Sequence, residues 1–187
     1  DGVVASLQGY GAPTIHVADH ADLAQPLARP WSKTIADLAA SVGATMVCMS
    51  TSSLGKDVLP RVATRLDAGM ASDVIDVVDT GEGTGYRRPM WAGALLADVV
   101  IDTDVHVATA RTSAFDAAAA TGGQSAVAVF AAEPDAASGG TRFVRFDETA
   151  NDRPSLDEAD VVVAGGRGLK SAEGFKILEP LADIFNA

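Results

Sequence analysis

Two short apolar segments, each followed by an amphipathic stretch, constrain the fold of this chain most. Residues 13–19 and 45–50 have the composition of buried strands, and residues 31–44 and 51–69 have the spacing of helices. The second helical stretch opens with hydroxyl residues suited to capping and continues with one apolar stripe: Val58, Leu59, Val62 and Leu66. This strand-helix-strand-helix order predicts a parallel sheet with helices on its faces, connected by right-handed crossovers.

The middle of the chain departs from this alternation. Three apolar segments follow one another without a helical stretch between them, at residues 72–79, 85–101 and 104–111. A Gly-rich run at 79–86 joins the first two as an exposed turn. Consecutive strands of this kind are common as an antiparallel extension of an α/β sheet. We therefore expect an α/β fold whose mostly parallel sheet is flanked by helices and carries antiparallel strands from the middle of the chain.

The last third of the chain indicates a boundary and a second unit. After an irregular Ala- and Gly-rich connection, residues 141–148 are predicted to form one more strand, and a polar, proline-containing run follows at 150–160. We place a domain boundary there, with an N-terminal α/β domain at 1–150 and a second unit at 151–187. The second unit reads as a strand at 161–163, a glycine turn and a helix.

The glycine turn resembles the start of a nucleotide site, but its spacing matches no phosphate-binding signature. The Walker pattern needs glycine directly before its lysine, and here Leu169 precedes Lys170. The dinucleotide pattern Gly-x-Gly-x-x-Gly is met at Gly166 and Gly168 but ends in Ser171. A second glycine-lysine pair at residues 55–56 also fails, because residues 50 and 57 are serine and aspartate instead of glycine and a hydroxyl residue.

The chemistry of the turn still favours an anion contact. Glycines at 165, 166 and 168 let the backbone approach a ligand, and the helix that follows presents unpaired N–H groups. Arg167 adds a fixed positive charge, with Lys170 and Ser171 placed to assist. The alternative for Arg167 is a surface salt bridge, for example with Glu173.

Charge and motif content exclude several functions. With 25 acidic and 14 basic side chains the formal net charge is −11, which opposes binding to nucleic acid or to an anionic membrane surface. An apolar content of 48% is sufficient for a packed core. No apolar run is long enough to span a bilayer, and the first residues lack the features of a targeting segment. Neither a nucleophile elbow nor a paired-acid motif is present, which argues against a hydrolase.

Cysteine and histidine residues are expected to be structural. Cys48 is the single cysteine, so no internal disulfide can form, and its apolar neighbours predict a thiol packed as a small hydrophobe. His16 and His20 have a helical spacing, but their β-branched neighbours favour a strand that leaves into a loop. His106 is expected within a strand. We predict no metal site.

Four segments in this order resemble the alpha subunit of electron transfer flavoproteins: SSLGKDVLPRVATRLDAGMASDVIDV, RRPMWAGALLADV, RTSAFDAAAATGG and DRPSLDEADVVVAGGRGLKSAEGFKILEPLADIF. The resemblance extends over most of the chain from about residue 12. It implies an N-terminal domain of the adenine-nucleotide alpha-hydrolase type without hydrolase activity. It also implies FAD bound mainly by a C-terminal domain, and a heterodimer with a beta subunit.

The function implied by this resemblance is electron carriage, not enzymatic turnover. Family members pass electrons from flavin dehydrogenases, such as the acyl-CoA dehydrogenases of fatty acid beta-oxidation, through FAD to a membrane quinone oxidoreductase. The bacterial cytoplasm and the mitochondrial matrix both suit such a chain. Among the family's FAD contacts, the arginine of the glycine turn maps onto Arg167.

Departures from the family pattern limit these expectations. The family's later Ser-Arg, Gly-Gln-Thr-Gly and Asn/Asp motifs, and its first strand and helix, have no counterpart here, so we expect a chain truncated at both ends that binds little FAD by itself. Two other functions stay open. One is adenine-nucleotide binding at residues 50–57, and the other is a scaffold that docks the beta subunit through the exposed face of the antiparallel strands.

Pro180 leaves one local alternative open. Phe175, Leu178, Ala182 and Phe185 fit one helical face, but proline in a helix interior costs about 3 kcal/mol. Either one helix kinks at Pro180, or a second helix restarts there.

Overall fold

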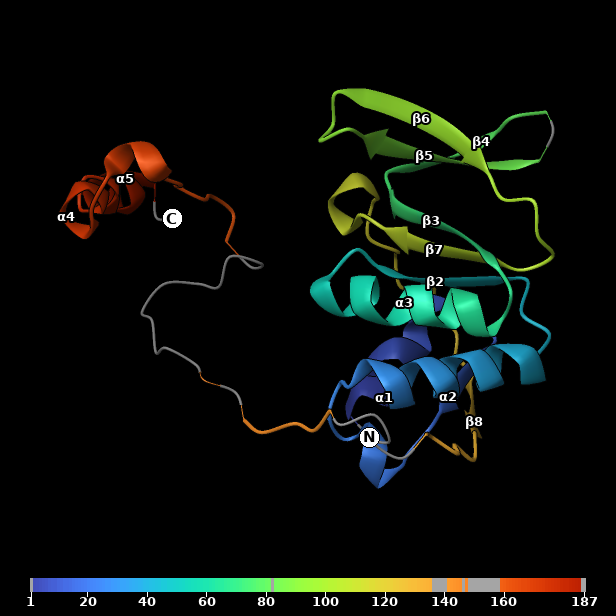
Figure 1. The fold of residues 1–187 in the computed structure, drawn as a ribbon. Coiled ribbons are helices and arrows are strands. Elements are labelled where there is room, and N and C mark those ends of the chain that lie inside the picture. The colour runs from blue at the N-terminus through green and yellow to red at the C-terminus, as the bar shows by residue number, and fades with distance from the viewer. Residues whose placement is uncertain (1, 82, 136–140, 146, 148–158, 186–187) are drawn as a thin grey trace. The chain divides into compact units, whose positions relative to one another are not determined.

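The chain divides into two compact units, Asp1–Phe143 (the first unit) and Val144–Ala187 (the second unit) (Figure 1). A computed structural model describes residues 2–81, 83–135, 141–145, 147 and 159–185 of the 187. The boundary expected between residues 150 and 151 lies outside the described residues.

A parallel sheet forms the centre of the first unit. Its three strands lie in the order β2, β7, β3, with bounds Met46–Ser50, His106–Ala110 and Gly69–Val74. Both outer strands run parallel to β7, and Met46 and Gly69 both pair with His106. The expected mixed α/β fold with a parallel sheet is therefore confirmed.

Helix α3 (Ser53–Arg65) packs against this sheet, and helix α2 (Ala28–Ser41) packs against α3. The α3 stripe predicted from the sequence faces inward, because Val58, Leu59 and Val62 are all 0% exposed. These side chains join Ala36 of α2 and Val107 of β7 in one hydrophobic cluster. Complete burial of side chains of this size stabilises the fold by about 1.5–3 kcal/mol each, so this cluster is a main source of stability.

An antiparallel sheet extends the first unit. Its strands lie in the order β4, β5, β6, with bounds Asp76–Asp79, Thr84–Met90 and Leu95–Val100. Tyr86 of β5 is 1% exposed and packs with Ala71, Val74 and Ala108 of the parallel sheet. This contact attaches the antiparallel sheet to β3 and β7.

Three strand predictions in this region were wrong in detail. The segment at 72–79 is divided between the end of β3 in the parallel sheet and β4 in the antiparallel sheet. The segment at 85–101 is a hairpin and not one strand, because Trp91, Ala92 and Gly93 all adopt positive φ and reverse the chain. The segment at 104–111 does not extend the antiparallel sheet. It forms β7, the central parallel strand, whose middle residues Val107, Ala108 and Thr109 are buried. Burial on both faces is typical of a central parallel strand.

A smaller parallel pair joins the beginning of the chain to residues beyond β7. Strand β1 (Thr14–Val17) pairs with β8 (Ala126–Val129), and helix α1 (Gly2–Leu7) precedes them. The sequence pattern predicted only β1 of these three elements. Helix α1 buries no residue, so its sequence has no apolar face with a helical period. Strand β8 has only four residues and lies in an Ala-rich run, so its alternation is too short to indicate a strand. Short 3₁₀ turns complete this unit at Gln8–Tyr10, Ala21–Leu23 and Thr112–Ala114.

The second unit contains a 3₁₀ turn, η4 (Arg167–Leu169), and two short helices, α4 (Ala172–Phe175) and α5 (Leu178–Phe185). The strand predicted at 161–163 does not form, because no described segment pairs with it. Residues 141–145 and 147 are not in a strand either, and the rest of that prediction lies outside the described residues. Pro180 lies in the first turn of α5, where its missing N–H is tolerated, so a second helix does start, two residues before the proline.

Cys48 is exposed, contrary to the expectation of a packed thiol. Alternate residues of β2, namely Met46, Cys48 and Ser50, are exposed, while Val47 and Met49 pack against the core cluster. Desolvation nevertheless raises the pKa of the Cys48 thiol, against a smaller opposing effect of the Ala110 backbone. A raised pKa lowers the thiolate fraction of Cys48 at neutral pH.

Candidate functional site

The structure brings all six predicted site residues into one turn between an extended segment and helix α4. Gly165 and Gly166 end the extended segment, and η4 begins with Arg167. Lys170 has a left-handed φ of 64° and turns the chain into α4. The Ser171 hydroxyl caps that helix by accepting a hydrogen bond from the Gly174 N–H at 3.3 Å.

The glycines of this turn serve different purposes. A Cβ atom at Gly165 would lie 2.4 Å from Cδ1 of Leu169 and 2.8 Å from Cδ1 of Leu178, so packing explains this glycine. At Gly166 and Gly168 a Cβ atom would meet nothing within 4 Å, and neither residue has a positive φ. Neither packing nor backbone conformation requires glycine at these two positions. The absent side chains leave the backbone open to an approaching ligand.

The positive charge of the turn is available to an anion. Arg167 and Lys170 are both exposed, and the Arg167 side chain makes no hydrogen bond or ion pair with any described residue. The alternative pairing of Arg167 with Glu173 is not formed. Glu173 instead pairs with Lys176 at 3.0 Å.

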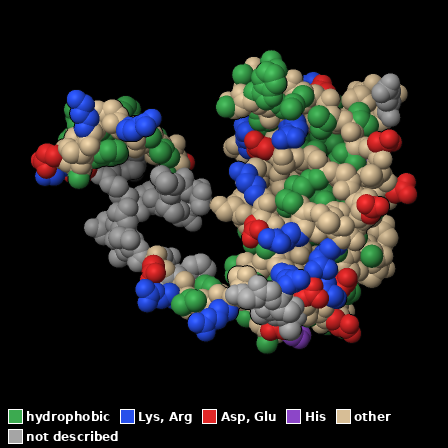
Figure 2. Space-filling model, viewed as in Figure 1, with side chains coloured by type: hydrophobic (Ala, Val, Ile, Leu, Met, Phe, Trp, Pro, Cys, Tyr) green, Lys and Arg blue, Asp and Glu red, His purple; other side chains and the backbone are tan. Residues whose placement is uncertain are grey.

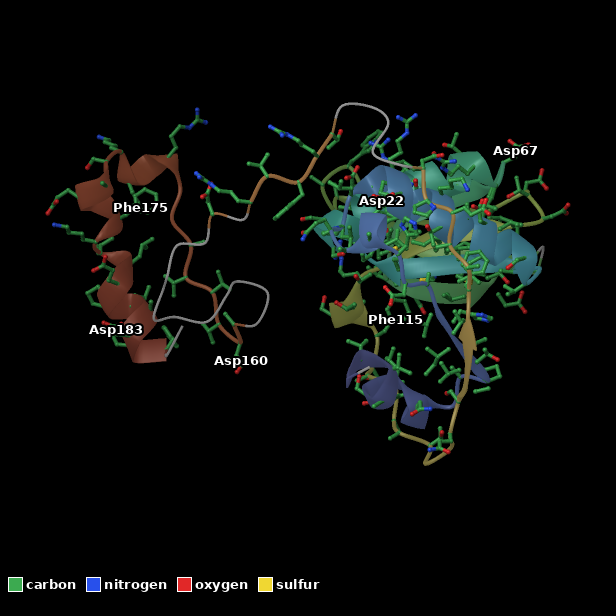
Figure 3. All side chains as sticks on the ribbon, turned by 90° about the horizontal axis from the view of Figure 1, so that it is seen from below. Asp22, Asp67, Phe115, Asp160, Phe175 and Asp183 are labelled. Atoms are coloured by element: carbon green, nitrogen blue, oxygen red, sulfur yellow. The ribbon has the colours of Figure 1, made fainter. Side chains whose placement is uncertain are left out.

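In the second unit, side chains point outward from the short helices that follow this turn (Figure 3). All six site residues are exposed, as are Phe175 on α4 and Ile184 and Phe185 on α5. An open turn of this kind can donate hydrogen bonds to one anionic group, but it does not enclose an apolar ring.

The other glycine-lysine corner, at residues 50–57, is accounted for by packing and capping. A Cβ atom at Gly55 would lie 2.1 Å from the carbonyl oxygen of Ser50, so glycine allows α3 to start close against β2. The Ser52 hydroxyl caps α3 by accepting from the Gly55 N–H at 3.2 Å, and it also hydrogen-bonds to the Ser50 hydroxyl at 3.2 Å. These groups already have partners within the corner.

A charged cluster at the carboxyl edge of the parallel sheet was not anticipated from the sequence. Asp73 of β3 accepts two hydrogen bonds from the guanidinium of Arg111, which follows β7, one of them from Nε at 3.0 Å. This hydrogen bonding holds the pKa of the Asp73 carboxyl below its ordinary value of 3.8, with Lys56 and Arg88 acting in the same direction. Only the strand order, which places β3 beside β7, brings these residues together.

Two of the three histidines, His20 and His106, have hydrogen-bond partners. His20 caps a 3₁₀ turn by accepting a hydrogen bond from the Asp22 N–H at 3.1 Å, and His106 hydrogen-bonds to the Tyr86 hydroxyl at 2.7 Å. Among the described residues, no group of three or more His, Cys, Asp or Glu side chains is placed to hold a metal ion. Within the same residues, no helix combines the length and apolar character needed to cross a membrane.

Comparison with known proteins connects both units to one family. Residues 2–135 match the electron transfer flavoprotein domain, and residues 155–187 match the electron transfer flavoprotein FAD-binding domain. The chain belongs to the family of electron transfer flavoprotein alpha subunits. The first of these matches alone covers more than half of the chain, and the second contains the whole glycine turn.

Relatives from bacteria and from mitochondria share this similarity. The alpha subunit of Pseudomonas aeruginosa is 38% identical over 183 residues, which cover 98% of this chain and 57% of that protein. The alpha subunit of Mycobacterium leprae is 33% identical, and the match covers 99% of this chain and 57% of that protein. The mitochondrial alpha subunit of Oryza sativa subsp. indica is 35% identical, and the match covers 91% of this chain and 48% of that protein. The chain therefore spans about half the length of these alpha subunits.

The glycine turn fits part of FAD. In an alpha subunit, the open backbone at Gly166 and Gly168 and the Arg167 guanidinium, which bonds to no described residue, suit an anionic group such as the pyrophosphate. Enclosure of the isoalloxazine ring requires residues other than those in this exposed turn.

Proposed function

We propose that this chain acts within a heterodimeric electron transfer flavoprotein as part of the alpha subunit, which carries electrons on FAD. The observation that supports this most is the coincidence of the FAD-binding family match with a turn in which packing does not require Gly166 or Gly168, and in which the Arg167 side chain bonds to no described residue. The proposed electron donors are flavin dehydrogenases, such as the acyl-CoA dehydrogenases of fatty acid beta-oxidation. The proposed acceptor is a quinone oxidoreductase.

In this proposal the residues of the glycine turn bind and orient the cofactor, while FAD supplies the redox chemistry. Arg167 donates charge-assisted hydrogen bonds to an anionic group of FAD, and the backbone at Gly166 and Gly168 allows close approach. Lys170 adds a second positive charge. Ser171 holds α4 against the turn through its capping hydrogen bond. Gly165 lets Leu169 pack beneath the turn.

Family membership also supports proposals for the partner and the compartment. We propose that the chain pairs with a beta subunit, and that the complex works in the bacterial cytoplasm or the mitochondrial matrix. One relative comes from a bacterium, and another is named as mitochondrial. Adenine-nucleotide binding at residues 50–57 is less well supported, because the hydroxyl groups of Ser50 and Ser52 are already used within the corner.

The experiment that tests this proposal uses the full-length alpha subunit carrying this sequence, co-expressed with its beta subunit. We expect a yellow heterodimer with a flavin absorbance spectrum that an acyl-CoA dehydrogenase reduces in the presence of substrate. A colourless complex that contains no FAD would contradict the proposal.

Replacement of Arg167 by alanine in that heterodimer should weaken FAD binding about tenfold or more, because a hydrogen bond to a charged group contributes roughly 1.5–3 kcal/mol. The FAD dissociation constant, measured by fluorescence titration of the apoprotein, gives the result. Lys176→Ala is the matched control, since Lys176 carries the same charge but is paired with Glu173. Equal dissociation constants for Arg167→Ala and the wild type would make Arg167 an ordinary surface residue.

A further inference from the structure

Three of the four segments that resemble the family each supply one basic side chain to the carboxyl edge of the parallel sheet. These side chains are Lys56, Arg88 and Arg111. Strands β2, β7 and β3 end at this edge, and α3 begins there. In open α/β sheets, ligands usually bind outside the carboxyl ends of the strands. The glycine turn belongs to the fourth segment, so the proposed function does not account for these three side chains.

The three side chains, which we call the basic cluster, lie near the carboxylate of Asp73. Arg111 donates to it from Nε at 3.0 Å and also from Nη2. Arg88 donates from Nη2 to the hydroxyl of the preceding residue, Ser72, at 2.9 Å. The pKa of the Asp73 carboxyl is lowered chiefly by the Arg111 hydrogen bond, and the charges of Lys56 and Arg88 contribute to the same effect. All three cations therefore act on one carboxylate.

The basic cluster carries more positive charge than its surroundings neutralise. The Lys56 side chain makes no hydrogen bond or ion pair with any described residue, and its neighbour Asp57 pairs with Arg61. In Figure 2, Lys and Arg side chains gather toward the left of the first unit, the side at which Figure 1 shows the arrowhead of β7. Several basic side chains elsewhere have carboxylate partners: Lys33 with Asp37, Arg65 with Asp135, and Arg87 with Asp98. In a chain of net charge −11, this local excess is where an anion can approach without repulsion.

Two buried side-chain atoms at this edge lack hydrogen-bond partners among the described residues. They are Nε of Arg88 and Oγ1 of Thr51. Thr51 lies beside the start of the Arg111 segment, because its N–H donates to the carbonyl oxygen of Ala110 at 2.8 Å. A buried donor without an acceptor is destabilising, and native proteins usually satisfy it with protein, water or a bound ion. The edge therefore has surplus donors as well as surplus positive charge.

A phosphate group complements both surpluses. The oxygens of a phosphate dianion accept hydrogen bonds, and guanidinium and ammonium groups are its usual donors in proteins. Asp73 occupies Nε and Nη2 of Arg111, which leaves Nη1 for a ligand. The first N–H groups of α3, which begins at Ser53, add positive potential at the same edge. Because the Arg111 side chain is 44% exposed, a substituent on the phosphate can extend into solvent.

We propose that the basic cluster and the start of α3 form a binding site for a phosphate group, carried either by free inorganic phosphate or by a phosphate monoester. Lys56 and Nη1 of Arg111 donate to the phosphate oxygens, and Arg88 adds its charge from β5. Asp73 limits the affinity, because its carboxylate holds Arg111 and repels the ligand. The site needs neither Ser50 nor Ser52 and includes no recognition of adenine. It lies wholly in the first unit, so it is separate from the glycine turn and does not depend on the proposed function.

Calorimetric titration of the full-length protein that carries this sequence with inorganic phosphate, at constant ionic strength and pH 7.5, tests this site. We expect Lys56→Gln to raise the dissociation constant about tenfold, because it removes a charged donor. Asp73→Asn should lower the dissociation constant about threefold, since it removes the competing negative charge. Lys33→Gln is the matched control, because it removes the same charge from α2, where Lys33 pairs with Asp37. Its dissociation constant should equal that of the wild type.

The variant Arg167→Ala distinguishes this site from the glycine turn. Wild-type phosphate binding by Arg167→Ala, together with the expected changes in Lys56→Gln and Asp73→Asn, supports the site. Phosphate binding that is lost in Arg167→Ala but retained in Lys56→Gln overturns it, as does a lack of saturable binding to the wild type. Ribose 5-phosphate is titrated in a second series. Tighter binding than inorganic phosphate, lost on Lys56→Gln, identifies a monoester as the ligand, and weaker binding with the same dependence identifies free phosphate.

Discussion

Gly55 determines how closely helix α3 can approach strand β2. Because a Cβ atom there would lie 2.1 Å from a backbone carbonyl oxygen, Gly55→Ala must shift the start of the helix that carries Val58 and Leu59. We expect a loss of roughly 1–3 kcal/mol in the free energy of unfolding, the usual cost of overpacking, measured by urea denaturation.

The matched control for this substitution is Gly9→Ala. A Cβ atom at Gly9 meets nothing within 4 Å, and the residue has no positive φ. Its free energy of unfolding should stay within about 0.5 kcal/mol of the wild type. Equal stability of the two variants would show that the close contact at Gly55 relaxes without cost.

At this scale, the role of Arg167 and its glycines as an anion contact stays a prediction, made from residue type and from the family resemblance. Packing was harder to predict. The exposure of Cys48 could not be found from residue type, since its apolar neighbours are the same whether or not a strand face is covered. Gly55 also looked like part of a failed phosphate loop until the Ser50 carbonyl was located beside it.

At the scale of elements, the ion pair between Asp73 and Arg111 ties the end of β3 to the chain that leaves β7. The pKa of Asp73 is lowered in the folded protein, so its contribution to stability is present above its ordinary value of 3.8 and is lost as the pH falls through the folded value. We expect acidification below about pH 4 to lower the unfolding free energy of the wild type more than that of Asp73→Asn.

Chemical denaturation at a series of pH values measures this difference. Asparagine tolerates the left-handed φ of 60° at position 73, so backbone strain does not contribute to the stability difference between the wild type and Asp73→Asn. Asp67→Asn is the control. Asp67 is exposed with a φ of 49° and forms no ion pair with any described residue. Parallel pH profiles for the wild type and Asp73→Asn would refute the linkage.

Element predictions succeeded where periodicity was strong and failed where a turn lacked its usual residues. Helices α2 and α3 and strands β1 and β2 carry apolar patterns of the expected period. The hairpin between β5 and β6 was not predicted, because the chain reverses with positive φ at Trp91 and Ala92. Tryptophan and alanine are not among the residue types that usually mark a turn. The apolar residues 161–163 predicted a strand, but a strand forms only where another segment supplies hydrogen-bond partners.

At the scale of the whole molecule, the second unit exposes most of its apolar side chains. Ile177, Ile184 and Phe185 are 69%, 76% and 57% exposed, and the glycine turn is open to solvent. We expect the 187-residue chain by itself to retain little FAD, because one anion contact without an enclosed ring site gives low affinity.

Flavin absorbance of the isolated chain after mixing with FAD and desalting measures this retention. Free FAD passed over the same column serves as the baseline. Recovery of one flavin for each chain would contradict the expectation and would show that this length of chain builds an enclosing site.

The position of β7 has a consequence for how the protein is made. On the ribosome, β2 and β3 emerge first, but in the described sheet neither has a hydrogen-bonded strand partner until His106–Ala110 has left the exit tunnel and inserted between them. The whole β4–β6 meander is synthesised in that interval. A sheet closed by a late central strand cannot assemble progressively with synthesis. Until then the backbone N–H and C=O groups along the edges of two strands lack their partners, and such edges can pair with neighbouring chains, so we expect the nascent protein to be most prone to aggregation in this interval.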